Sequence, residues 1–169
     1  MQPKFCSFHR SIVVLLTLLG LGAFAPAASA QTLQVFMKAD GIPGESVDVD
    51  HRSEIALTGY SQTFGTRNCS RVVANKTIDR ASPLLISRAA ANQLIPTVVI
   101  SMRKAGEGQK DFFKATLNLV LVDRIELVEE NGQLVEHVVM APRNITIEYR
   151  PQDDKGGLGA AVVSNISCG

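Results

Sequence analysis

Most of the residues that could do chemistry lie in one acidic stretch near the beginning of the chain. It holds His51 together with four carboxylates, at Asp40, Glu45, Asp48 and Asp50. Carboxylates beside an imidazole can bind calcium or zinc, but this spacing fits neither the EF-hand loop nor the HExxH pattern. Two interpretations stay open, a cation site and a solvated acidic loop. The composition of the stretch favours the solvated loop.

The usual signatures of catalysis are missing from the rest of the sequence. It contains no Gly-x-Ser-x-Gly elbow, and no Ser-x-x-Lys with the matching downstream motifs. The stretch 106–110 superficially resembles a phosphate-binding loop, but it is short and precedes no predicted helix, so a hairpin turn explains it better. His137 has no metal-type spacing to other ligands. We therefore expect no catalytic residue, no metal and no cofactor.

The charge balance limits the possible partners. Seventeen Lys and Arg face sixteen Asp and Glu, which gives a net charge of +1. Proteins that bind nucleic acid generally carry a basic excess, so we expect no nucleic-acid partner. Hydrophobic residues make up 46% and charged residues 20%, a composition that favours a folded domain over disorder.

The first thirty residues have the pattern of a secretory signal peptide. Lys4 and Arg10 precede an apolar run over 12–24, and Ala28-Ser29-Ala30 provides small residues for a signal peptidase. The run is short for a membrane span, which needs about 20 residues, although an uncleaved anchor remains the alternative. We expect export to the periplasm or medium, with one domain over 31–169 and no membrane contact after cleavage.

Export would leave two cysteines, Cys69 and Cys168, because Cys6 lies in the predicted signal peptide. An oxidising compartment allows them to form a disulfide. The bond would close a loop of about 100 residues and, in the chain-entropy model, stabilise the fold by roughly 4–5 kcal/mol. Two free thiols are the alternative.

The hydropathy pattern predicts a mainly β protein with one helix. Ser82 followed by Pro83 indicates a helix N-cap, and Asn92 and Pro96 indicate its end. Asn131-Gly132 predicts a hairpin. Strands are expected at 33–39, 54–64 (one long strand, bent or bulged at Gly59), 71–78, 97–104, 110–129, 133–140, 144–150 and 160–166.

The alternation within two of these strands indicates their faces. In 110–129, Leu119 shares its parity with Ala115 and Leu117, but Val120 and Val122 make both faces apolar, which suggests buried pairing there. In 144–150, Tyr149 is predicted to point inward with Ile145 and Ile147. Strands without a repeating β-helix-β order favour a β-sandwich or a β-barrel.

Four stretches, in order, resemble one family. They are Asp40-Gly41-Ile42 with Gly44-Glu45-Ser46 and the later His51 and Glu54-Ile55, the block 76–85 (Lys-x-x-Asp-x-x-Ser-Pro-x-Leu), Met102-Arg103-Lys104-Ala105-Gly106, and 147–153. This pattern is similar to that of the haemolysin-coregulated proteins (Hcp), which build the tube of the type VI secretion system. The resemblance covers nearly all of residues 31–169.

The resemblance implies a β-barrel of two sheets with a single flanking helix and no catalytic residues. It also implies a homo-hexameric ring that stacks into a tube, with secretion-system or effector partners. The extended loop Glu45–Ser53 would contribute to packing between rings. The family-pattern residues are Asp40, Gly41, Gly44, Glu45, Ser46, His51, Lys76, Asp79, Ser82, Pro83, Leu85 and Tyr149.

Two features depart from the family pattern, namely the signal peptide and the cysteine pair. Tube proteins of this family assemble in the cytoplasm, from which a signal peptide would remove this chain. The main prediction is therefore a secreted, ring-forming Hcp-like tube or effector-family protein. The alternative is an exported Hcp-fold binding module in the envelope, outside the tube. A hydrolase is the least favoured reading, because no catalytic constellation is visible.

Overall fold

The computed structural model describes residues 32–65, 69–106, 110–153 and 155–168, with the backbone alone described at 69 and 70. The predicted signal peptide lies outside these ranges, as does part of the predicted turn at 106–108. Within them, no helix is long and apolar enough to span a membrane.

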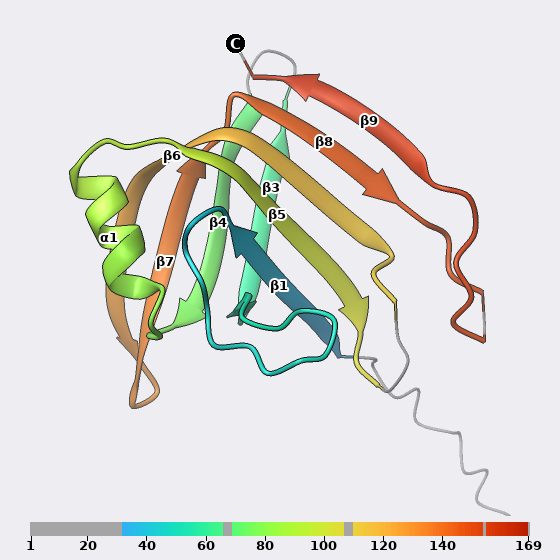
Figure 1. The fold of residues 1–169 in the computed structure, drawn as a ribbon, viewed down its shortest axis with the longest axis horizontal. Coiled ribbons are helices and arrows are strands. Elements are labelled where there is room, and N and C mark those ends of the chain that lie inside the picture. Colours follow the sequence, from blue (N-terminus) through green and yellow to red (C-terminus); the bar gives the residue numbers. More distant parts are fainter. Residues whose placement is uncertain (1–31, 66–68, 107–109, 154, 169) are drawn as a thin grey trace, which may run out of the picture. The chain divides into compact units, whose positions relative to one another are not determined.

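The described chain forms nine strands and one helix (Figure 1). Every predicted strand has a counterpart, although the ends shift by a few residues and the predicted strand 54–64 is divided in two. The elements are β1 (Leu33–Ala39), β2 (Ile55–Leu57), β3 (Gly59–Phe64), β4 (Cys69–Thr77), α1 (Ser82–Ala90), β5 (Ile95–Lys104), β6 (Phe113–Glu130), β7 (Gln133–Ala141), β8 (Asn144–Tyr149) and β9 (Val162–Ser167).

All strand pairs are antiparallel, in the order β2-β1-β5-β6-β7-β4-β3, and β8 and β9 extend from β6. The mainly β fold with one flanking helix is confirmed for the described residues, but their hydrogen bonds do not close the sheet into a complete barrel. The two end strands, β2 and β3, are nevertheless consecutive in the chain. Thr58 joins them, and its amide donates to the Asn75 carbonyl at 2.8 Å.

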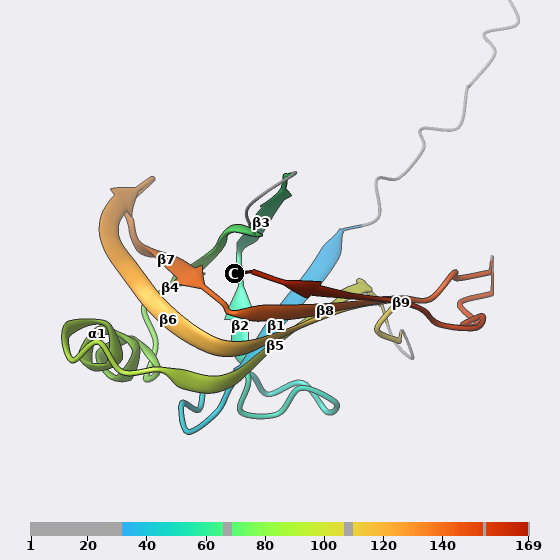
Figure 2. The same cartoon turned by 90° about the horizontal axis from the view of Figure 1, so that it is seen from above.

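The long strand β6 belongs to both halves of the structure. Its first part pairs with β5 and β8, and its second part pairs with β7 (Figure 2). The change occurs around Leu119, whose φ of 52° is left-handed, and a register shift follows between Val122 and Arg124. The bend lets the two halves of the sheet face a common core.

The core is made of inward side chains from both halves. Leu119 is exposed although it shares the parity of Ala115 and Leu117, because the bend reverses the alternation there. Val120 and Val122, on the other parity, are buried. Tyr149 is also exposed, where it was expected to point inward. The largest fully buried apolar side chains are Met37, Ile55, Val72, Leu85, Ile95, Val98, Ile100, Leu117, Met140 and Ile145.

The helix α1 packs against β6 and buries Leu85. Its predicted cap is wrong, because the helix begins at Ser82 and the residue before it, Ala81, has helical dihedrals and makes no side-chain cap. The hydroxyl of Ser82 points instead into a buried polar cluster. The predicted end is confirmed, since the helix ends at Ala90 and Asn92 is left-handed, with φ 52°.

The hairpin predicted at Asn131-Gly132 is confirmed. Glu130 and Gln133 are paired, and both central residues have positive φ, at 52° and 79°. Two successive left-handed residues are what a type I′ turn requires. This turn connects β6 to β7.

We predict that glycine is tolerated at Leu119 although the position lies inside a strand. A residue with a side chain is strained in the left-handed region by roughly 1–2 kcal/mol, and glycine removes this strain. The gain offsets the larger conformational entropy that glycine loses on folding. Leu119→Gly should therefore change the unfolding free energy by about 1 kcal/mol or less. The control Leu121→Gly, at a half-buried position two residues on, should destabilise by about 2 kcal/mol or more. Equal losses in urea unfolding would contradict the bend.

Candidate functional site: a loop fixed by two polar clusters

The acidic stretch forms a loop over residues 43–54, between β1 and β2. Backbone hydrogen bonds close its neck, from the Gly44 amide to the Ser53 carbonyl at 2.8 Å and from the Ser46 amide to the Glu54 carbonyl at 2.9 Å. A Cβ at Gly44 would lie 2.3 Å from the Glu54 carbonyl oxygen. Glycine is thus required at this family-pattern position because two backbones meet there.

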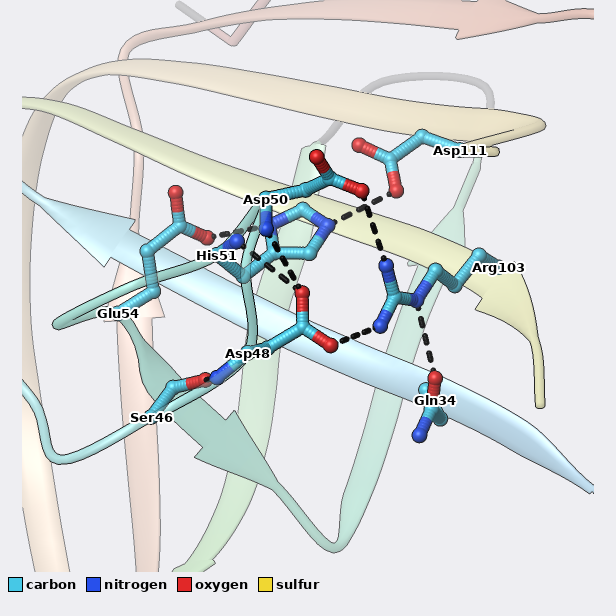
Figure 3. A network of polar contacts seen from close by, with 8 residues as sticks. All are labelled: Gln34, Ser46, Asp48, Asp50, His51, Glu54, Arg103 and Asp111. Carbon is cyan, nitrogen blue, oxygen red and sulfur yellow. Dashed lines mark hydrogen bonds and ion pairs between the residues drawn. The ribbon is translucent and has the colours of Figure 1, made fainter. Parts of the chain in front are cut away.

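His51 anchors the loop from inside. Its side chain is buried, and its ring stacks on Phe36 of β1 with centroids 4.1 Å apart. Nδ1 lies 2.8 Å from Oε2 of Glu54, and Nε2 lies 3.1 Å from Oδ1 of Asp111 (Figure 3). The ring therefore connects the loop to the segment that precedes β6.

Arg103 of β5 anchors the outer part of the loop. It is buried, its Nε donates to Oε1 of Gln34 at 2.9 Å, and its guanidinium forms ion pairs with Asp48 and, at 3.4 Å, with Asp50 (Figure 3). The same guanidinium lies 5.2 Å from the centroid of Phe36. The residues around His51 and Arg103 are called below the His51–Arg103 cluster: Gln34, Phe36, Asp48, Asp50, His51, Glu54, Arg103 and Asp111.

Asp48 is the most heavily bonded carboxylate of the loop. Oδ1 accepts the amides of Asp50 at 3.0 Å and His51 at 3.2 Å. Burial by itself would raise the pKa of Asp48, but the hydrogen bond from Arg103, the two amides and the guanidinium charge outweigh it and hold that pKa below its usual value. Asp48 therefore stays ionised and keeps the loop folded over β1 and β5.

The outward side of the loop carries two large apolar side chains beside polar ones such as that of Arg52. Val47 and Val49 are 87% and 85% exposed, which makes them the most exposed large apolar side chains among the described residues. A groove of about 540 Å³ runs beside Val47, with Phe36 on one wall and Ile78 on another. A fixed loop thus presents two bare valines to solvent.

A second group of polar side chains is sealed in the core beneath the start of α1. Lys76 of β4 is directly opposite Glu136 of β7, and both side chains are fully buried. The Lys76 ammonium contacts Oε2 of Glu136, Oδ1 of Asp79 at 2.8 Å and Oγ of Ser82 at 2.9 Å. Its three donors therefore have three partners. These four residues are called the Lys76 cluster.

The cluster explains the spacing of three family-pattern residues. Lys76, Asp79 and Ser82 are three residues apart, and the turn before α1 brings them to one ammonium group. The Ser82 hydroxyl also donates to Glu136 at 2.7 Å and accepts the Asp79 amide at 3.0 Å. Oδ1 of Asp79 accepts the Ala81 amide at 2.9 Å, so the turn is bonded from both sides.

Sequence reasoning did not find Glu136, Arg103 or Asp111 as site residues. A signal for Glu136 was present, because it shares the inward parity of Val138 and Met140 in β7. A charged residue at such a position needs a buried partner. Asp111 carried no comparable signal, because its contact with His51 joins residues 60 positions apart.

The geometry favours a structural role for these groups. Both ring nitrogens of His51 face carboxylates, so neither is available as a general base. Asp48 and Asp50 come together around Arg103, whereas Glu45 accepts the Arg80 amide at 3.1 Å. The described residues contain no group of three or more His, Cys, Asp or Glu that could hold a metal ion. The cation interpretation of the loop therefore finds no support there.

The remaining family-pattern residues have local roles. Gly41 turns the chain after β1 with a φ of 74°. Pro83 occupies the first turn of α1, and Leu85 is its buried apolar contact. Tyr149 packs edge-on against Phe112 with centroids 6.5 Å apart.

Comparison with known proteins identifies relatives. A family model described as "Type VI secretion system effector, Hcp" matches residues 36–149. A crystal structure of Hcp1 from Salmonella typhimurium is 26% identical, with a TM-score of 0.71 over 80% of this chain and 94% of that one. A type VI secretion system effector from Yersinia pestis is similar in fold, with 23% identity and a TM-score of 0.68 over 79% and 98%. A search of curated proteins gives no significant match.

We predict that breaking the Lys76–Glu136 pair is far more harmful than replacing both partners. Glu136→Leu leaves a buried ammonium short of charge compensation and should destabilise the fold by about 3–5 kcal/mol. The double variant Lys76→Met/Glu136→Leu removes the uncompensated charge and should regain much of that loss. Urea unfolding of the two single variants and the double variant measures the coupling.

The exposed pair Arg124–Glu126 is the matched control. Glu126→Leu should change the unfolding free energy by less than about 1 kcal/mol, as is usual for surface ion pairs. Additive losses at Lys76 and Glu136 would contradict the charge argument.

We predict that the contribution of Asp48 to stability disappears in acid. Because its folded-state pKa is lowered, the contribution is complete above its unfolded pKa of about 3.9 and is lost as the pH falls through the folded value. Asp48→Asn should therefore reduce the unfolding free energy near neutral pH. The difference from the parent should shrink as the pH falls below the unfolded pKa and through the lower folded one.

A series of urea unfolding curves across pH tests this prediction. Asp50→Asn is the control, because that carboxylate is exposed and more distant from the same guanidinium. Its effect should be small at every pH. A gap for Asp48→Asn that keeps its size throughout the acid range would show that the ion pair does not stabilise the loop.

Proposed function

This chain belongs to the family of Hcp, the type VI secretion system effectors, and from that membership we propose that it is a ring-forming structural subunit with no catalysis of its own. The family comprises structural tube and effector proteins, which are secreted components of that system. Six copies would surround a lumen, and rings would stack into a tube. The partners of this chain would then be its own copies and other secretion-system or effector proteins.

The observation that carries the proposal is the 43–54 loop. His51, Asp48 and Glu54 are engaged in holding its shape, and its tip presents the exposed side chains of Val47 and Val49. Apolar side chains on a fixed backbone suit contact with another protein surface, because little order has to be created on binding. The loop is therefore our candidate for the contact between rings.

Strand β9 is the candidate for contacts within a ring. It pairs with β8 on one side, and its six residues contain no charge. Val162 and Val163 are exposed on it. Natural sheets usually protect such an edge with lysine, proline or a bulge. A strand with neither lysine nor proline favours contact with a neighbouring subunit, and a ring requires such head-to-tail contacts between different surfaces.

We further propose that the exported form consists of residues 31–169. The pattern at Ala28-Ser29-Ala30 supports cleavage after Ala30. β1 begins at Leu33, so this cleavage would leave every described strand intact. Cleavage would remove Lys4 and Arg10 with the signal peptide. Fifteen of the seventeen basic residues would then remain against sixteen acidic ones, which gives a net charge of −1.

A disulfide between Cys69 and Cys168 is proposed for the same exported form. Cys69 begins β4, and Cys168 follows β9. The Cys168 amide donates to the Arg143 carbonyl at 2.8 Å, and its side chain packs against the hydrophobic core. The bond would tie the last strand to the other half of the sheet.

The second candidate function is an exported binding module outside the tube. The signal pattern and the cysteine pair favour it, because both suit a protein that folds beyond the cytoplasm. On this reading the fold is that of Hcp, but the chain is a monomer or an isolated ring that recognises a partner in the envelope.

We predict that the exported protein sediments as a hexamer at micromolar concentration and that Val163→Lys converts it to monomer. A lysine on the free edge would place a charge in the contact between subunits, and the exposed position should leave the unfolding free energy nearly unchanged. Analytical ultracentrifugation of protein taken from the periplasm or medium provides the measurement.

Leu134→Lys is the matched control, because Leu134 is exposed on β7, which is paired on both sides. It should leave the hexamer intact. A monomer before any substitution would reject the ring and favour the binding module. In the same preparation, mass spectrometry should give an N-terminus at Gln31, and thiol titration after denaturation should detect no free cysteine.

A further inference from the structure

The turn formed by residues 79–82 contacts both the 43–54 loop and the Lys76 cluster. Its two ends, Asp79 and Ser82, are held by the buried ammonium of Lys76. Between them lies Arg80, whose backbone and side chain face the other way, toward the neck of the loop. The loop and the core cluster therefore share one short segment of chain.

Arg80 makes two contacts with the neck of the loop. Its Nε donates to the Gly44 carbonyl at 2.6 Å, and its amide donates to Oε1 of Glu45 at 3.1 Å. Arg80 itself is exposed, so these contacts are not part of the apolar core. The residues that it holds are followed directly by Ser46 and Val47, where the loop leaves its neck.

The position of Arg80 is set by the Lys76 cluster, which lies on the core side of the turn. The Asp79 carboxylate and the Ser82 hydroxyl are fixed by Lys76, and Lys76 is fixed by Glu136 on the neighbouring strand. All three donors of the Lys76 ammonium have partners, and the one oxygen of the cluster that is buried without a hydrogen bond to a described residue is Oε1 of Glu136, which takes no part in the turn's contacts with Lys76. A shift of the turn would have to break these buried contacts.

We propose that Arg80 is a positioning residue for the 43–54 loop and that the Lys76 cluster sets its place, so that the buried ion pair and the exposed valines act as one mechanical unit. His51 and Arg103 hold the far part of the loop, and Arg80 holds the neck. The consequence for assembly rests on the proposed function, whereas the coupling itself does not.

Hydrogen exchange on the complete exported protein tests the coupling directly. The reporters are the amides of Gly44, Ser46 and Ser53, which donate the hydrogen bonds of the neck. Arg80→Ala should reduce their protection about tenfold relative to the slowest core amides. Arg124→Ala removes another exposed arginine, on β6, and should leave their protection unchanged. Unchanged protection in Arg80→Ala would overturn the proposal.

A second variant tests the action at a distance. Glu136→Gln weakens the hold on Lys76 without touching the loop, and it should also reduce the protection of the neck amides relative to the core. Ile145→Ala is a buried truncation in β8 that controls for general destabilisation. It should lower all protection together. If the neck amides and the core amides lose protection by the same factor in Glu136→Gln, as expected for Ile145→Ala, the role of the cluster is overturned.

Assembly distinguishes this inference from the proposed function. Arg80→Ala should lower the association constant for the stacking of rings, measured by sedimentation, about tenfold. The thermal midpoint of this variant should stay close to that of the parent. Arg80→Lys retains a donor and should restore part of the stacking, which a loss of stability alone would not explain. Faster neck exchange with unchanged stacking would support the positioning by Arg80 and reject the loop as the contact between rings.

Discussion

The structure depends on one buried ion pair, Lys76 with Glu136. Two charges removed from water are tolerated only when they are paired and their remaining hydrogen-bonding groups are satisfied. Asp79 and Ser82 supply the remaining partners of the Lys76 ammonium, whereas Oε1 of Glu136 is buried without a hydrogen-bond partner in the described part of the chain. These contacts fix the turn before α1 and so the place where the helix begins. The same turn carries Arg80 to the neck of the 43–54 loop. A requirement of the core is thus transmitted to a surface feature over a few contacts.

A second constraint is the shared use of strands. β6 passes from one half of the sheet to the other at Leu119. The chain also crosses between the halves at Thr58, since β2 pairs with β1 and β3 pairs with β4. Two halves joined in this way can enclose a core without a complete ring of hydrogen bonds. Among the described strands β9 pairs with β8 alone, so the arrangement leaves it at an edge of the sheet. The uncharged sequence of β9 is consistent with the contact between subunits that we propose for it.

These features account for a loop that gathers titratable side chains and uses several of them for structural contacts. His51, Asp48 and Glu54 have the chemistry of an active site, but each is committed to a neighbour that stabilises the loop. The outward side chains include Val47 and Val49 beside the exposed Asp50 and Arg52. The chain belongs to a family of secretion-system tube and effector proteins, and the assembly role proposed for this loop is consistent with that membership.

The sequence by itself determined the local structure: the hairpin at Asn131-Gly132, the left-handed end of α1 at Asn92, most strands and the family pattern, because turn chemistry and alternation act over a few residues. Only the tertiary structure decided what depends on contacts across the sheet. Ser82 has the type of an N-cap, but Lys76 and Glu136 draw its hydroxyl into the core. Leu119 and Tyr149 follow the inward alternation, but the bend of β6 and the outer position on β8 expose them. Arg103, Asp111 and Glu136 gain their roles from partners about 50 to 60 residues away, and such pairings are set by strand register, which one sequence does not reveal.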